Sequence, residues 1–168
     1  MSNFTLTHEI NCTAEQFVKM FFDNAYNDAL YKQALGCPGF ALTIKSTSAT
    51  QIVGSFSGKL VKGLSLPVIK AVGASEIQYS ESGTFDTQAM LWSATLNTSY
   101  LPDRFSGSCK VSLVAVGSNK VSRVVKYSVV NSIFGIGGLI DSLFEAQLRA
   151  DADASAAQMN QRIAAGNI

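Results

Sequence analysis

The last third of the chain contains its longest segment without a helix-breaking residue. A short glycine-rich turn (Gly135, Gly137, Gly138) begins it, and neither glycine nor proline occurs again before Gly166. In its first half, apolar side chains recur at helical spacing, at Ile136, Leu139, Ile140, Leu143, Phe144 and Leu148. We therefore predict one long C-terminal helix that ends near Ala165 and extends for ~40 Å.

The second half of this segment has a different composition from the first. Between Asp151 and Arg162 it is rich in alanine, and we expect Asp151, Asp153 and Arg162 to be exposed. Only the first half is apolar enough for deep burial. We therefore expect the second half to extend toward solvent or toward a partner.

Most of the chain before this helix alternates apolar and polar residues, which is typical of half-buried β-strands. Two short helices interrupt the pattern after the first strand, Asn3–Ile10. Thr13–Gln16 has the sequence of a capping box, and a second helix is predicted over Tyr26–Leu35, ending at Gly36. Further strands are predicted near residues 40–44, 52–60, 75–85, 90–96, 105–115 and 121–129, with an irregular crossing at 66–72 and a turn at 101–103. These elements predict an α+β chain in which about seven antiparallel strands form a long, curved sheet.

Length and charge limit the organisation and the partners of the chain. Its 168 residues fit a single domain covering residues 1–168, with a core large enough to need no disulfide or metal. The net charge is +1 and the lysines and arginines are scattered, which argues against nucleic acid as a partner. No apolar run approaches the length of a membrane span, and the N-terminus lacks the features of a secretory signal. We therefore expect a cytoplasmic protein.

Metal and cofactor sites are not predicted. The three cysteines, Cys12, Cys37 and Cys109, have no metal-like spacing, and we expect reduced thiols. The chain has one histidine, His8, so a histidine-rich metal site is excluded. The glycine-rich turn lacks the lysine of a phosphate-binding loop, so close chain approach at the helix entry explains it better.

Several short motifs resemble those of one known fold family. They are the helix entry Cys12–Phe17, the crossing at Leu66–Pro67 and the start of the last helix, Gly137–Ile140. With the order of the elements, these motifs resemble the START-like (SRPBCC, helix-grip) superfamily. Together with Asn27–Tyr31, they are most similar to an uncharacterised START-like family of bacterial proteins. The resemblance spans nearly the whole chain and implies binding of an apolar ligand between the sheet and the long helix.

Three polar side chains fall on the inward side of the predicted strands: His8, Glu81 and Arg123. A buried charge needs solvent, a partner or a ligand. Arg123 could therefore hold a ligand carboxylate, or Glu81 and Arg123 could lie near strand ends or pair with each other. The full set of candidate ligand-binding residues is Phe56, Tyr79, Glu81, Met90, Trp92, Leu96, Phe105, Val111, Arg123, Tyr127, Ile140, Phe144 and Gln147.

The main prediction is a protein that binds, carries or sequesters a hydrophobic small molecule such as a lipid, sterol, fatty acid or polyketide-like compound. Small inward residues (Gly54, Gly58, Ala94, Gly107 and Ala115) favour a hollow interior over a solid one. One alternative is a cyclase/aromatase-type enzyme using Arg123 with Tyr79 or Tyr127. Another is a non-catalytic interaction domain with a solid core that dimerises through its last helix. Transient membrane contact and a homodimer are both compatible with the sequence, and enzymatic activity is less expected than binding.

Overall fold

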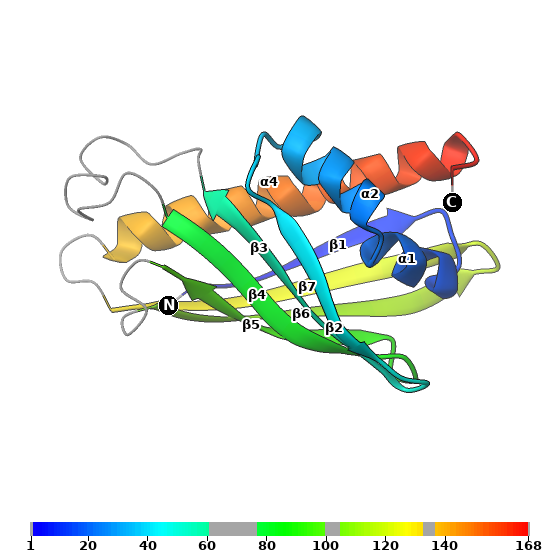
Figure 1. Ribbon diagram of the computed structural model, residues 1–168, viewed down its shortest axis with the longest axis horizontal. Coiled ribbons are helices and arrows are strands. Elements are labelled where there is room, and N and C mark those ends of the chain that lie inside the picture. Colours follow the sequence, from blue (N-terminus) through cyan, green and yellow to red (C-terminus); the bar gives the residue numbers. More distant parts are fainter. Residues whose placement is uncertain (1, 61–76, 100–104, 133–136, 168) are drawn as a thin grey trace.

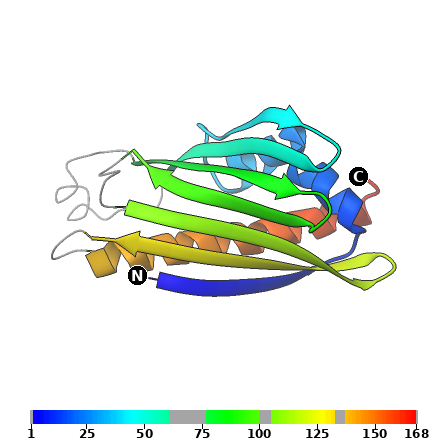
Figure 2. The same cartoon turned by 90° about the horizontal axis from the view of Figure 1, so that it is seen from below.

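The computed structural model describes residues 2–60, 77–99, 105–132 and 137–167. In these residues an antiparallel sheet of seven strands packs on one long helix, α4 (Gly137–Ala164), which runs along the sheet (Figures 1 and 2). The strand order is β1-β7-β6-β5-β4-β3-β2. The strands are β1 (Ser2–Ile10), β2 (Ala41–Thr47), β3 (Gln51–Leu60), β4 (Ile77–Asp86), β5 (Leu91–Thr98), β6 (Phe105–Gly117) and β7 (Lys120–Asn131). The predicted α+β helix-grip architecture is confirmed.

Short helices connect β1 to β2. α1 (Ala14–Phe21) begins with the predicted capping box, in which Thr13 and Gln16 exchange hydrogen bonds. α2 (Asn24–Asp28) continues directly into a π-helical turn, η1 (Ala29–Ala34). The helical segment ends before Gly36, whose φ of 65° is a conformation that glycine adopts without strain. The second predicted helix is therefore present, but it starts earlier and its last part is wider than an α-helix.

The sheet curves where small residues stand opposite one another on its inner face. The register pairs Gly54 with Gly83, Gly83 with Ala94, and Ala94 with Cys109 across four strands. A Cβ atom on Gly83 would lie 2.4 Å from the carbonyl oxygen of Ser93, so a side chain does not fit there. Glycine at this position therefore allows β4 and β5 to approach closely.

Aromatic rings fill the end of the core beneath α1. Phe21 and Phe22 contact Phe56 and Trp92 with ring centroids 5.2–6.5 Å apart, and the Trp92 side chain is fully buried. Such edge and offset contacts add to the stability gained from burial alone. This part of the interior is solid.

The second half of α4 is buried more deeply than predicted. Ala152, Ala156 and Met159 face the core, and Asp151 is half-buried instead of exposed. Arg162 is also half-buried and lies over the Tyr26 ring, whereas Asp153 is exposed as expected. The small alanine side chains allow the helix to lie close to its neighbours, so this half does not extend into solvent.

Side chains along α4 bind the edge strand β1 at three levels. The Ser2 hydroxyl donates to Glu145 at 2.6 Å, and His8 contacts Asp153 at 2.8 Å. Asn160 donates to the Glu9 carbonyl at 3.0 Å and accepts from the Asn11 amide at 2.9 Å. The helix is therefore fixed to this edge of the sheet along most of its length.

Two predicted features lie outside the described residues: the crossing at Leu66–Val72 and the turn at 101–103. The glycine-rich turn falls partly outside as well, and the helix is described from Gly137. None of the helices described here is long and apolar enough to cross a membrane. Met90 was predicted within a strand; it instead occupies the turn before β5, with a φ of 49°.

Candidate functional site

A cavity of about 60 Å³ lies between the inner face of the sheet, the α2–η1 segment and α4. This volume holds about two water molecules. The sheet side of its wall consists of Phe56, Tyr79, Glu81, Cys109, Val111, Arg123, Val125 and Tyr127. The remaining wall residues are Phe21, Tyr26, Asn27, Tyr31, Phe40, Asp151, Ala152 and Ser155. Much of this wall is aromatic, yet it also contains two acidic side chains, Glu81 and Asp151, and one basic side chain, Arg123.

Glu81 is a buried carboxylate in the middle of β4. It accepts a hydrogen bond of 2.7 Å from the Tyr79 hydroxyl and another from the indole N–H of Trp92. Burial raises the pKa of Glu81, and these donated hydrogen bonds act in the opposite direction. The alternation of β4 places Tyr79 and Glu81 on the same face, so the local sequence alone brings this pair together.

All four tyrosines among the described residues line the cavity, namely Tyr26, Tyr31, Tyr79 and Tyr127. Burial raises the pKa of the Tyr31, Tyr79 and Tyr127 hydroxyls well above the usual value. These hydroxyls therefore stay protonated. The Tyr79 hydroxyl already donates its proton to Glu81, but its oxygen can still accept a hydrogen bond from a ligand. The Tyr31 ring stacks flat on Phe40, with centroids 3.8 Å apart.

Arg123 is a buried cation whose terminal nitrogens already have partners. They donate to the Ala152 carbonyl at 2.6 Å, to the Ser155 hydroxyl at 3.1 Å and to Nδ1 of His8 at 3.0 Å. Burial lowers the pKa of Arg123, although an arginine at this depth still carries its proton. Arg123 thus attaches β7 to α4, and it lies within β7 rather than at its end.

Asp151 brings a second carboxylate to the cavity from α4. The amide of Gln147, one helical turn earlier, donates to it at 2.6 Å. Burial raises the pKa of Asp151 from 3.8 to about 6. Within the described residues, no ion pair joins Arg123 to Glu81 or to Asp151. The pairing of Glu81 with Arg123 that the sequence left open is therefore not formed.

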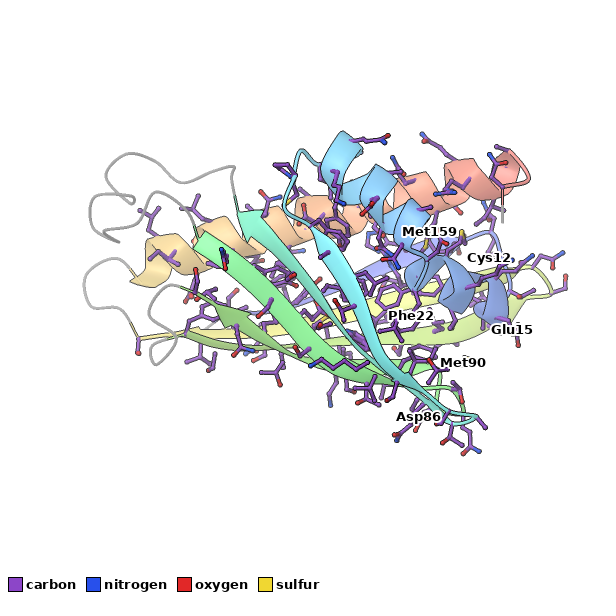
Figure 3. The ribbon with its side chains drawn as sticks, viewed as in Figure 1. Cys12, Glu15, Phe22, Asp86, Met90 and Met159 are labelled. Carbon is purple, nitrogen blue, oxygen red and sulfur yellow. The ribbon has the colours of Figure 1, made fainter. Side chains whose placement is uncertain are left out.

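Six of the thirteen candidate residues line this cavity: Phe56, Tyr79, Glu81, Val111, Arg123 and Tyr127. Gln147 does not line the cavity, but its amide donates a hydrogen bond to Asp151, which does. Trp92 and Leu96 are fully buried in the core, and Ile140 is also in the core. The Phe105 ring contacts the tilted ring of Phe144, with centroids 5.0 Å apart. Figure 3 shows Met90 near Asp86 at the end of the β4–β5 hairpin, and Met90 does not line the cavity.

Sequence reasoning missed the wall residues that the helices supply, above all Tyr26, Tyr31, Asp151 and Ser155. The concentration of tyrosines in an otherwise aliphatic and phenylalanine-rich interior was the signal available for the first two. Among the described residues, no three His, Cys, Asp or Glu side chains gather closely enough to hold a metal ion.

Several solved structures are similar to this chain over nearly its full length. The Zhui aromatase/cyclase from Streptomyces sp. R1128 matches with a TM-score of 0.65 and 13% identity over 99% of both chains. Norcoclaurine synthase from Thalictrum flavum matches at 0.63 and 12% identity, over 96% of this chain and 95% of that one. A START superfamily protein from Mycobacterium smegmatis matches at 0.57 and 14% identity, over 95% and 97%.

No protein-family model and no curated protein matches the sequence. The resemblance to one particular bacterial family therefore stays a prediction. The structural match nevertheless extends over nearly the full length of several proteins at low sequence identity. This chain has the helix-grip fold of the START-like proteins.

Proposed function

We propose that the protein binds a small, largely apolar molecule carrying one or two polar groups in the cavity between the sheet and α4. The observation that carries this proposal is the wall itself, where Glu81, Asp151 and four tyrosines line one space among aromatic rings. These groups place hydrogen-bond acceptors and aromatic surface around one void, which is the combination typical of small-molecule sites.

The size of the cavity restricts the ligand. Typical small-molecule sites occupy ~300–1,000 Å³, whereas this one measures about 60 Å³. A sterol or fatty acid would have to displace many side chains, so we favour a compact aromatic or polyketide-like molecule. Even this ligand requires part of the wall to move.

The wall formed by Tyr31 and Phe40 is the part we expect to open. Helix α4 is held by its contacts with β1 and by Arg123, so its movement would break several hydrogen bonds. Tyr31 lies in the π-helical turn, an irregularity that often marks functional positions. Separation of the Tyr31–Phe40 stack would enlarge the cavity without disturbing the sheet.

The geometry supports the tyrosine hydroxyls and Glu81 as the polar anchor more strongly than Arg123. Both N–H groups of one terminal nitrogen of Arg123 are used, by His8 and by the Ala152 carbonyl, so a ligand carboxylate could form a two-bond contact with the guanidinium only by replacing one of them. Fatty acids are therefore poorer candidates than neutral or cationic molecules.

Binding can be followed through Trp92, the only tryptophan of the chain, because its indole N–H contacts Glu81 in the cavity wall. We expect small phenolic and aromatic compounds to change its fluorescence saturably. Ala152→Leu, which fills the cavity from α4, should abolish the change. Ala156→Leu is the matched control, since Ala156 is buried one turn later on the same helix but does not line the cavity.

Native mass spectrometry and organic extraction of the purified protein would identify a ligand retained from the cell. Binding that is unaffected by Ala152→Leu in a folded protein would contradict the assignment of this cavity. Absence of both a retained molecule and any probe binding would favour the alternative of a non-catalytic interaction domain.

A catalytic role is the second candidate, and Glu81 is the observation that favours it. A buried carboxyl group with a raised pKa and a tyrosine donor can exchange a proton with a bound molecule. One structural neighbour is an aromatase/cyclase. With an aromatic polyketide substrate, Glu81→Gln should remove turnover while binding persists; unchanged turnover would exclude this role for Glu81.

A further inference from the structure

We infer that the cavity selects ligands that carry a protonated amine, which its two carboxylates and its tyrosine rings would hold. This inference rests on the proposed function and specifies its ligand class. It starts from the charges that face the cavity and from the partners that each of them already has.

Glu81 and Asp151 both reach the cavity without a cationic partner among the described residues. The hydrogen-bond donors to Glu81 are neutral: the Tyr79 phenol, the Trp92 indole and the Cys109 thiol. Asp151 accepts a hydrogen bond from the neutral side-chain amide of Gln147. Each carboxylate is therefore solvated by dipoles and retains the capacity to bind a cation.

Among the described residues that line the cavity, Arg123 is the one cation, and its hydrogen bonds go to groups other than Glu81 and Asp151. Arg123 donates to His8, and His8 in turn contacts the exposed carboxylate of Asp153 at 2.8 Å. The guanidinium keeps its positive charge in the cavity wall, where it offsets one of the two carboxylates. With Glu81 and Asp151 ionised, these three side chains leave one net negative charge facing the cavity.

The rest of the wall suits an ammonium group as well. Tyr26, Tyr31, Tyr79 and Tyr127 surround the space, and aromatic faces attract cations. An ammonium head is about as large as a water molecule, so it fits the existing cavity of about 60 Å³. The apolar body of the ligand would then occupy the space opened at Tyr31 and Phe40.

Three probes of one shape test this inference: benzylamine, benzyl alcohol and benzoate, titrated calorimetrically into the full chain at neutral pH. We expect benzylamine to bind about tenfold tighter than benzyl alcohol, and benzoate to bind weakest. Asp151→Asn and Glu81→Gln should each weaken benzylamine severalfold more than they weaken benzyl alcohol. Two variants are used so that a folding defect in either one leaves the other informative.

The outcomes separate this inference from the proposed function. If benzyl alcohol or benzoate binds as tightly as benzylamine, the cavity binds ligands but the selection for an amine is wrong. If benzylamine binds tightest but neither variant weakens it, the carboxylates do not carry the selection and the inference also fails. If none of the probes binds, both proposals are overturned.

Discussion

Arg123 and His8 face each other directly across strands β7 and β1, and the arginine donates a hydrogen bond of 3.0 Å to Nδ1 of the histidine. Because Nδ1 accepts, the proton of a neutral His8 ring is on Nε2, from which it is donated to Asp153 on α4. Three side chains thus connect a buried cation to the surface, and the same connection attaches the helix to the edge of the sheet.

Replacing His8 by leucine should lower the free energy of unfolding by ~1–3 kcal/mol, because a buried donor of Arg123 loses its acceptor. Asp153→Asn is the control, since that side chain is mostly exposed and such surface pairs contribute at most ~1 kcal/mol. Urea unfolding of the two variants measures both effects. Equal losses in the two variants would show that the surface contact, rather than the contact with Arg123, is what stabilises this connection.

The sheet half of the site followed from the sequence because a strand has a period of two. Alternation alone placed Tyr79, Glu81, Arg123 and Tyr127 on the inner face, where the structure has them. Their distances from one another depend on the curvature of the sheet and on strand register, which no local pattern specifies.

The helical half of the site was less accessible to sequence reasoning. Tyr26 and Tyr31 both line the cavity although they are five residues apart, a spacing that rotates an α-helical position by about 140°. The π-helical turn between them changes that phase. On α4, alanines tolerate burial and exposure alike, so the pattern around Asp151 did not indicate which face would turn inward.

Gly83→Ala should destabilise the protein by ~1–3 kcal/mol, because the new methyl group would lie 2.6 Å from the Cβ of Ala94 and closer still to Ser93. Gly138→Ala is the matched control: no atom lies within 4 Å of the added group, and alanine favours the first turn of α4. Thermal unfolding of the pair should show a lower Tm for the first variant and an equal or higher one for the second. A neutral Gly83→Ala would mean that the strands separate easily at this point.

One of the three thiols should react quickly with Ellman's reagent at pH 8 in the native protein. Burial raises the pKa of Cys12 to about 11 and that of Cys109 well above its usual value, and both side chains are almost inaccessible. Cys37 is only half-buried. Cys37→Ser should therefore remove the fast phase, while denaturant should expose the other two thiols. Two or more fast thiols in the native protein would contradict the buried positions of Cys12 and Cys109.

Asp151 should make the protein less stable as the pH rises from about 4 to about 6. Its pKa is raised from 3.8 to about 6 in the folded protein, so the folded state binds the proton more tightly than the unfolded chain does. Asp151→Asn removes this titration and keeps an oxygen that can accept from Gln147. The variant should match the wild type near pH 4 and exceed its free energy of unfolding at pH 7 by at most about 3 kcal/mol.

Taking the difference between the two proteins cancels the contribution of Glu81, whose pKa is raised in the same direction. Urea unfolding at both pH values measures the difference, and Gln147→Leu, which removes the hydrogen bond that lowers the pKa of Asp151, should steepen the loss. If the difference between Asp151→Asn and the wild type is the same at pH 4 and pH 7, Asp151 is not desolvated and cannot serve as a buried charge of the cavity.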